Sequence, residues 1–417
     1  MNEPPDRDDP PARDQRRATG RSGREHRKAE RRRPKREWKS TNGSLTFFNR
    51  NPELGYKPVI GDVPLVAETL RDAFLSGDND PAATQRSKVA GLLSGIGDQL
   101  GGLFSRSGGS PPPSVRSRAV YRGDGSLIPE YLEQNRLAQT RFPERIKSPT
   151  VTLAHMKAAP VIEKPCIYLG DLRDHFGHFL LESLARAWCL EQADAATALL
   201  FHGSTEPERL GSFAHDIFRA LGGSLSRIKV VRADLRVGHL IVPKSQYWAG
   251  LKASPGMCVV FDRIRETMAR GRTNRGATPT RVYFTRRNLA SEPEPPWHRR
   301  PILNEDEAEA VFRKRGFEIL APESLPFEDQ VAIAANATHI AGASGSALHL
   351  VLFNGNPRTR LIELRTKHAV NQLMINTIRG VQGFHIWCVK GPVSPLHKVL
   401  DIDAVERALE EIDQIAP

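Results

Sequence analysis

The sequence lacks any long apolar run. No stretch of its 417 residues approaches the ~20 apolar residues that a membrane-spanning helix needs. The first residues, MNEPPDRDDPPARD, also lack the apolar segment of a secretory signal peptide. The four cysteines are widely scattered and form no C-x-x-C spacing for a metal or a redox pair. These absences predict a soluble cytoplasmic protein with reduced cysteines.

The common nucleotide motifs are also missing. No G-x-x-x-x-G-K-[ST] loop, G-x-G-x-x-G loop or D-x-D follows an apolar run that reads as a strand. The first two motifs cradle phosphates in ATPases and dinucleotide-dependent dehydrogenases, so those two classes of enzyme are disfavoured. No internal repeat is visible either.

Positive charge is abundant but unevenly spread. The net charge is +12, and residues 1–40 contain 14 Lys and Arg against 8 Asp and Glu, a net of +6. With so few apolar residues this part cannot bury a core, so residues 1–45 are expected to be a disordered polybasic tail. Such a tail is either simply solvated or a contact for an anionic membrane surface or nucleic acid.

Residues 46–118 are expected to be weakly structured, with a short helix around VAETLRDAFL. The segment VAGLLSGIGDQLGGLF, residues 89–104, has helical apolar spacing, but its glycines each cost up to about 1 kcal/mol of helix stability. It is expected either to order on a bilayer or a partner, or to be a connector. GGSPPPSVRSR then marks a linker.

From residue 119 onward, β-rich apolar runs alternate with helical patterns. The runs include KPCIYLG, ATALLFHG, RVYFTRR, THIAGA and TRLIELR. This alternation predicts an α/β fold of parallel sheets covered by helices. Two doubly wound, Rossmann-like domains are expected, at residues 119–272 and 278–380, followed by an extension, 381–417. Its last helix, DIDAVERALEEIDQI, should bury Val405, Leu409 and Ile412 and cross back onto the first domain.

The stretch DHFGHFLLESLARAW places two histidines and an aspartate before an apolar helix face. Phe179, Leu180, Leu184 and Trp188 recur at helical spacing and should pack on a core. Asp174, His175 and His178 then cluster at the start of a helix, where free N–H groups favour anions and hydrogen-bonding side chains. This stretch alone also fits an ordinary interpretation, in which Asp174 is a helix N-cap and His178 is a buried core histidine.

In the second half, HIAGASGSALHLVLF places a small-residue loop between a strand and a helix. The loop residues Ser344, Gly345 and Ser346 can bring backbone N–H and hydroxyl donors to a phosphate, although a plain turn has the same composition. Arg286 ends the RVYF strand at the sheet edge where open α/β sheets bind ligands, and a guanidinium suits phosphate. Asn304 reads as a helix N-cap, and Glu363 ends a strand where a carboxylate can accept from ribose hydroxyls.

The order of these pieces resembles glycosyltransferase family 61, the capsular polysaccharide biosynthesis-like glycosyltransferases. The resemblance spans roughly Tyr168 to Glu363 and rests on HFGHFLLESLAR, YFTRR, RPILNEDE, PFEDQVAIAANATHIAGASGSALHLVLF and LIEL. The chain departs from the family pattern at His175, where the family has Asn, at Ser344, where it has His, and at Leu350, where it has Asn.

The resemblance implies a GT-B-like enzyme in which two Rossmann-like domains face a cleft. Such an enzyme transfers a sugar from a nucleotide sugar to a glycan or glycolipid hydroxyl with inversion, in bacterial polysaccharide or capsule biosynthesis, without a metal or other cofactor. The resemblance implies the following residues. The catalytic residues are His178, Asp174 and Glu182, with the base undecided between His178 and Asp174; the donor-binding residues are Arg286, Arg300, Asn304, Ser344, Gly345, Ser346 and Glu363.

Two other functions fit the same sequence. A polysaccharide pyruvyltransferase, or another group transferase of similar fold, would share the two-domain outline and the glycine loop. A nucleic-acid-binding protein without catalysis would use the arginine-rich tail, and its affinity would fall steeply with salt. Glycosyl transfer is the interpretation taken forward, with no nucleic acid partner expected. The enzyme is expected in the cytoplasm, with its tail in peripheral contact with the inner face of the membrane.

Overall fold

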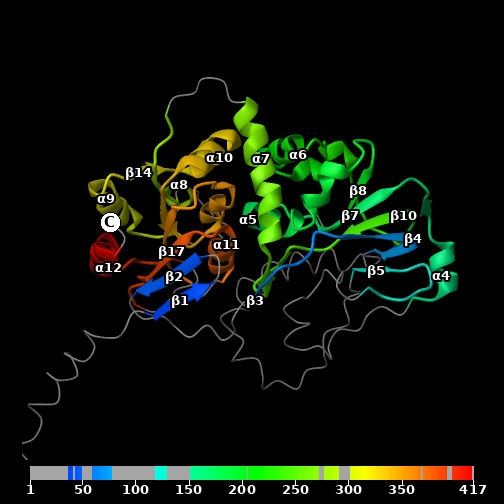
Figure 1. The fold of residues 1–417 in the computed structure, drawn as a ribbon, viewed down its shortest axis with the longest axis horizontal. Helices are drawn as coiled ribbons and strands as arrows, with labels where there is room; N and C mark the ends of the chain where they lie inside the picture. The colour runs from blue at the N-terminus through cyan, green and yellow to red at the C-terminus, as the bar shows by residue number, and fades with distance from the viewer. Residues whose placement is uncertain are drawn as a thin grey trace, which may run out of the picture. The chain divides into compact units, whose positions relative to one another are not determined.

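The computed structural model describes most of the chain from residue 36 to residue 415. The described ranges are 36–40, 43–48, 59–77, 118–128, 151–203, 205–271, 277–290, 301–367, 370–391 and 397–415. The chain divides into two compact units, residues 1–36 and 37–417, and every described residue except Arg36 lies in the second. The second unit contains two large sheets and a small one (Figure 1).

The first large sheet has a parallel centre and an antiparallel edge. In spatial order its strands are β5 (Ala119–Tyr121), β4 (Ala67–Ser76), β10 (Leu235–Pro243), β7 (Cys166–Asp171), β8 (Ala198–His202) and β9 (Ile228–Val230), and β6 (Val161–Ile162) also pairs with β10. Strands β10, β7, β8 and β9 are mutually parallel. Strand β4 is antiparallel to β10, and β5 is antiparallel to β4.

The second large sheet is parallel from β14 to β2. In spatial order its strands are β1 (Arg36–Ser40), β2 (Gly43–Phe48), β17 (Gln382–Trp387), β16 (Arg360–Arg365), β15 (His339–Ala343), β13 (Arg281–Phe284) and β14 (Glu318–Leu320). A small sheet joins β11 (Tyr247–Trp248), β12 (Lys252–Ala253) and β3 (Val59–Ile60). The predicted α/β class with parallel sheets is confirmed.

Helices and helical turns connect many of these strands along the chain. The α-helices are α4 (Leu153–Ala158), α5 (Phe176–His178), α6 (Ser212–Ala220), α7 (Cys258–Gly271), α8 (Arg287–Ala290), α9 (Glu305–Lys314), α10 (Phe327–Asn336), α11 (Asn371–Arg379) and α12 (Ile402–Ile415). The 3-10 turns are η5 (Ala187–Gln192), η6 (Pro207–Arg209), η7 (Leu225–Arg227), η8 (Pro255–Met257), η9 (Pro322–Ser324) and η10 (Ser346–Phe353); η4 (Phe179–Ser183) is a π-helical turn.

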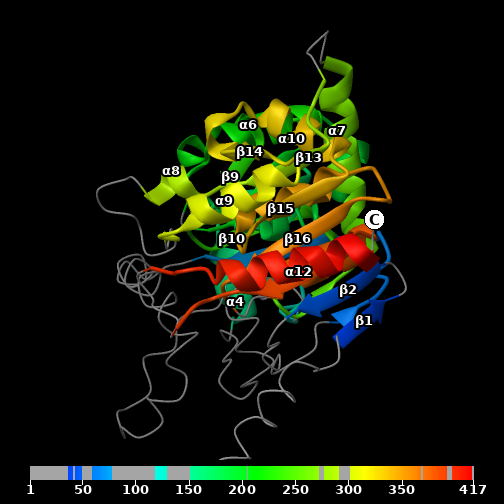
Figure 2. The ribbon, with the colours of Figure 1, turned by 90° about the vertical axis from the view of Figure 1, so that its left-hand side faces the viewer.

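Helices cover both faces of the second sheet. Strand residues alternate between two cores, as the two-residue period of a strand requires. Val282 faces α10, η10 and α11, whereas Tyr283 faces α9 and α12. Figure 2 shows α12 lying across strands β16 and β2 on the α9 side. Predicted to be buried, Val405, Leu409 and Ile412 are at most 3% exposed. The predicted crossing of α12 onto the first domain is wrong, because these side chains complete the second sheet's own core.

The structure has two halves: the first large sheet with its helices, and the second large sheet with its helices. One core joins them. Helix α7 packs against α6 of the first half and against α10 and η10 of the second (Figure 1). The Phe261 and Phe353 rings meet edge to face with centroids 5.1 Å apart. Asp262 of α7 pairs with Arg379 of α11, whose Nε donates to the carbonyl oxygen of Asn354 at 2.6 Å. Polar and apolar contacts therefore both hold α7 to the second half.

The structure corrects two expectations for the first hundred residues. The helix expected in VAETLRDAFL is wrong: residues 67–76 form β4, which pairs with β10 from Ala67 to Leu75 and buries Phe74 completely. The end of the expected disordered tail is also structured, since β1 and β2 extend the second sheet and Phe47 of β2 stacks on His385, with ring centroids 5.2 Å apart. The segment 89–104 and the Pro-rich linker as far as Ser117 lie outside the described residues.

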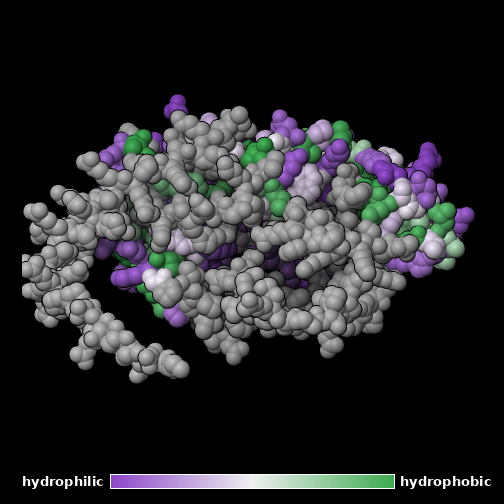
Figure 3. Space-filling model, turned by 90° about the horizontal axis from the view of Figure 1, so that it is seen from below, coloured by the Kyte–Doolittle hydropathy of each residue, from purple (hydrophilic) through white to green (hydrophobic). Residues whose placement is uncertain are grey.

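The described surface is mixed in polarity. Figure 3 shows hydrophilic and hydrophobic residues interleaved over the coloured part of one face. Exposed large apolar residues come from separate elements, for example Leu153 of α4 and Ile415 of α12. Over the ranges that the structure describes, no helix has both the length and the apolar content needed to cross a bilayer.

Candidate active site

The candidate residues lie where strand order reverses in each sheet. In the first sheet the chain proceeds from β7 outward through β8 to β9 and then returns to β10 on the other side of β7. In the second it proceeds from β13 to β14 and returns to β15 on the other side of β13. A crevice opens beyond the carboxyl ends of parallel strands at such a switch point, and ligands bind there. Asp174 and His175 follow β7, Arg286 follows β13, and Ser344 follows β15.

A chain of charged side chains organises the end of β7. Asp171 is 4% exposed and accepts from Arg118 at 3.1 Å and from Arg173 at 2.7 Å. Arg173 also pairs with Glu182, with 3.3 Å between Nε and Oε2. The other oxygen of Glu182 meets Nδ1 of His178. A fixed carboxylate at Nδ1 orients the imidazole and leaves Nε2 directed away from it.

The segment after Gly177 is not the regular α-helix that the sequence predicted. One short α turn passes into the π turn η4 and then into the 3-10 turn η5. The apolar expectation is nevertheless confirmed, because Phe179, Leu180 and Leu184 are fully buried. His178 and Asp174 are exposed, so His178 is not a core histidine. The π turn still aligns His178 with Glu182 four residues later, and π turns are frequent at functional sites.

Arg286 is held through both its backbone N–H and its guanidinium. Its backbone N–H donates to both oxygens of Glu305, each 3.1 Å away, and its Nη1 donates to the carbonyl oxygen of Ser344 at 2.9 Å. Gly345 permits this contact, because a Cβ there would lie 2.2 Å from the same nitrogen. The guanidinium therefore bridges the carboxyl ends of β13 and β15.

Two buried carboxylates of α9 were missed by the sequence reasoning. Glu305 and Glu309 are at most 2% exposed and face the end of β13. Thr285 donates to Glu309 at 2.6 Å, and Arg287 and Arg313 pair with the same carboxylate at 3.2 and 3.0 Å. Burial, partly offset by the hydrogen bonds and charge of Arg286, raises the pKa of Glu305 to about 7. Their four-residue spacing, which puts both on one helix face, was the available signal.

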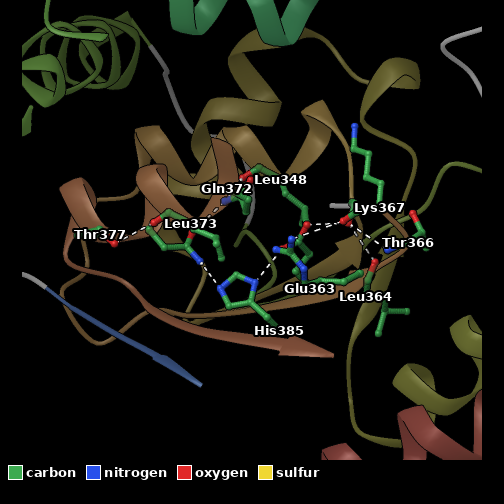
Figure 4. A network of polar contacts seen from close by, with 12 residues as sticks. Leu348, Glu363, Leu364, Thr366, Lys367, Gln372, Leu373, Thr377 and His385 are labelled. Atoms are coloured by element: carbon green, nitrogen blue, oxygen red, sulfur yellow. Dashed lines mark hydrogen bonds and ion pairs between the residues drawn. The ribbon is translucent and has the colours of Figure 1, made fainter. Parts of the chain in front are cut away.

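Glu363 belongs to a buried polar network with His385 (Figure 4), and Ser344 of the loop also contacts Glu363. The Ser344 hydroxyl donates to Glu363 at 2.6 Å, and Glu363 also binds Arg365 at 3.0 Å and Nδ1 of His385 at 2.7 Å. Burial alone would raise the pKa of Glu363, but the charge of Arg365 and these hydrogen bonds lower it to about 2. Burial lowers the pKa of His385, and the hydrogen bond and charge of Glu363 partly offset this effect. With three partners and 1% exposure, Glu363 does not face the cleft, which argues against the ribose contact expected for it.

The two halves touch through Gly177. A Cβ on this residue would lie 2.7 Å from the Ser346 Cβ and 3.1 Å from Nδ1 of His349. His349 is 9% exposed, and its Nδ1 has no hydrogen-bond partner among the described residues. Burial, with Lys367, His178 and His175 nearby, lowers the pKa of His349 to about 3. The helix start and the serine loop thus approach as closely as a glycine allows.

Beside this contact lies a cleft of about 900 Å³ lined by both halves. Its polar lining includes His175, Arg286 and Ser346, together with the acidic residues Asp216, Glu323 and Glu328. Its apolar part includes Phe213 and Phe327, whose rings are in aromatic contact at 6.5 Å. A cleft of this size, lined by both apolar and polar side chains, is large enough for a small ligand.

The remaining predicted residues lie elsewhere. Asn304 precedes α9 as expected, but its side chain makes no cap and instead clamps Leu400 through both backbone groups, at 3.1 and 2.8 Å. Of the predicted site residues that the structure describes, Arg286 and Ser346 line the cleft. The others do not: Asp174, His178, Glu182, Asn304, Ser344, Gly345 and Glu363. Arg300 lies outside the described residues. Among the residues described, no group of three His, Cys, Asp or Glu side chains is arranged to hold a metal ion.

Comparison with known proteins points to one family. No curated protein matches the chain. Residues 176–362, however, match the family model described as Glycosyltransferase 61. The matched segment runs from α5 through β16 and contains His178, Arg286 and the serine loop. The match over residues 176–362 supports glycosyltransferase family 61 for this segment, and with it a glycosyltransferase activity.

Proposed function

We propose that this glycosyltransferase moves a sugar from a nucleotide-sugar donor to a glycan or glycolipid hydroxyl with inversion at the anomeric carbon. The observation that carries the proposal is the cleft in which His175 of the first half faces Arg286 and Ser346 of the second. A GT-B-like arrangement brings donor and acceptor together between two such sheets. The shared cleft supports that arrangement here.

The donor diphosphate is assigned to Arg286 and the start of η10. Arg286 is directed to this position by its bonds to Glu305 and Ser344, so little freedom is lost when an anion binds. Backbone N–H groups at the start of η10, beside Ser346, add donors for an anion. The aromatic and proline side chains of the cleft, such as Phe213, Phe327 and Pro322, offer an apolar surface to the nucleobase. Gly345 lets the guanidinium pass close to the loop.

His178 is assigned as the general base, in preference to Asp174. Its Nδ1 is occupied by Glu182, which stabilises the imidazolium once Nε2 has taken the proton of the acceptor hydroxyl. The acceptor oxygen then forms its bond to the anomeric carbon as the bond to the donor phosphate breaks. The leaving diphosphate keeps that electron pair, and Arg286 stabilises its charge.

The wider setting is also part of the proposal. We assign the reaction to polysaccharide biosynthesis in the cytoplasm, with the basic N-terminal residues in contact with the inner face of an anionic membrane. Transfer is proposed to proceed without a metal or other cofactor, with cationic side chains holding the diphosphate instead. No nucleic acid partner is included.

The test is a comparison of donors. The full chain is incubated separately with UDP, GDP, CMP and dTDP sugars and with phosphoenolpyruvate, and both thermal stabilisation and donor consumption are measured. A donor that binds only the folded state raises the melting temperature. We expect one nucleotide sugar to do so and to be consumed. Consumption of phosphoenolpyruvate alone would refute glycosyl transfer in favour of pyruvyl transfer.

A further inference from the structure

Glu305 fixes the main chain at Arg286, which follows β13. The guanidinium of Arg286 reaches both the serine loop and the cleft. Both of its oxygens accept the Arg286 N–H, and Tyr283 donates its hydroxyl to Oε1 at 3.2 Å. The carboxylate is 2% exposed and does not line the cleft. Of its contacts among the described residues, the one with a residue that lines the cleft is to Arg286.

We propose that Glu305 is the positioning residue for an anion bound at Arg286, and that anion binding there is coupled to uptake of a solvent proton by Glu305. The inference rests on the proposed function only in taking the anion to be a diphosphate. Nothing else about the sugar or the acceptor is required.

The charges around Glu305 give the direction of the coupling. Among the described residues, the charged or titratable groups that face it are Arg286, Tyr283 and Glu309, and Cys388 faces Tyr283 in turn. Burial holds the pKa of Glu305 at about 7, so both protonation states are populated near neutral pH. An anion at Arg286 offsets the positive charge that favours ionised Glu305. The anion adds negative charge of its own, so the neutral acid is favoured further.

Glu309 is not expected to respond in this way. Arg287 and Arg313 both pair with it and Thr285 donates to it, so its charge is balanced by partners that do not include Arg286. The two buried acids therefore have different parts. Glu309 stabilises the strand end, and Glu305 connects that end to the ligand.

The experiment measures binding of inorganic pyrophosphate by calorimetry from about pH 6 to about pH 8.5. Wild type is compared with Glu305→Gln, which keeps an acceptor for the Arg286 N–H but cannot titrate, and with Glu305→Ala, which removes the acceptor. Glu307→Gln is the matched control, because Glu307 lies in the same helical turn and is exposed. Titration of pyrophosphate itself and of the nearby histidines cancels when affinities are expressed as the ratio of wild type to variant.

At the acid end of the range we expect wild type and Glu305→Gln to bind equally. The ratio should fall about three- to tenfold toward the alkaline end, as expected when a pKa moves by half a unit to one unit on binding. Glu305→Ala should bind at least about tenfold more weakly than Glu305→Gln at every pH, since a charged group loses its orientation. The Glu307→Gln ratio should stay constant.

A pH-independent ratio for Glu305→Gln would overturn the coupling, and equal affinities of the Gln and Ala variants would overturn the positioning role. Failure of wild type to bind pyrophosphate would overturn both. If instead the ratio changes as expected while no nucleotide sugar is bound or consumed, the inference stands and the proposed function fails.

Discussion

Replacing Gly177 with Ala tests the contact between the helix start and the serine loop. In an open helix this change stabilises the fold by up to about 1 kcal/mol, because alanine is the better helix former. Here the new methyl group would lie 2.7 Å from the Ser346 Cβ and 3.1 Å from Nδ1 of His349. Overpacking of this kind costs about 1–3 kcal/mol. The net expectation is a loss of about 0–2 kcal/mol in the free energy of unfolding.

The effect on catalysis should exceed the effect on stability. To relieve the contact, α5 must move away from the loop, and His178 lies on α5. A displacement of about 1 Å between reacting groups can cost about 10²-fold in rate. Turnover measured at saturating donor should therefore fall by about 10- to 100-fold, while urea denaturation reports the smaller change in stability.

The control is Gly61→Ala, where a Cβ would meet nothing within 4 Å. The double variant Gly177→Ala/Ser346→Gly removes the nearer clash and should recover about 1 kcal/mol of the lost stability in a double-mutant cycle. Wild-type turnover in Gly177→Ala, or additive effects of the two changes on stability, would refute the close approach as the reason for a glycine here.

Three further predictions concern single side chains, and a fourth concerns metal ions. His178→Gln should lower turnover by about 10² or more while donor affinity stays within twofold, as expected for a lost general base; unchanged turnover would leave Asp174 as the candidate. Arg286→Ala should weaken donor binding by about 1.5–3 kcal/mol in calorimetry and lower the free energy of unfolding by about 0.5–1.5 kcal/mol through the lost bond to Ser344; wild-type donor affinity would remove Arg286 from the donor site. The depressed pKa of Glu363, about 2 against an ordinary 4.5, stabilises the fold by about 3 kcal/mol above pH 4.5, and this stability is lost as the pH falls toward 2; an acid denaturation curve unchanged in Glu363→Gln would contradict this. Transfer should survive EDTA, and a loss that Mn²⁺ or Mg²⁺ reverses would show that the proposed metal-free mechanism is wrong.

Much of the strand pattern could be read from local sequence, because each central strand is a short β-rich run with two buried faces. RVYF and RLIELR became β13 and β16 for this reason. VAETLRDAFL could not be read in the same way. Its apolar residues also fit a helical period, and the strand that pairs with it, β10, begins about 160 residues later in the chain.

Chain order alone determines the position of two parts of the candidate site. Parallel strands end at one edge, so the histidine segment after β7 and Arg286 after β13 both reach a cleft. The burial of Glu363 and Glu305 could not be predicted, for the opposite reason. A strand-end carboxylate and a first-turn acid both have common local interpretations, and only tertiary contacts with His385 and Arg286 show that these two are buried.

The core that α7 shares with the second half has a thermodynamic consequence. Rotating one sheet away from the other would expose side chains such as Phe261 and Phe353, at a cost of about 1.5–3 kcal/mol for each. Separate unfolding of the two halves is therefore disfavoured. The described core should unfold in one cooperative transition, with equal calorimetric and van't Hoff enthalpies. If the two halves do not separate when a ligand enters, binding buries little apolar protein surface other than that of the cleft. The heat capacity change of donor binding should therefore be small and set by the ligand's own apolar area rather than by closure of two domains.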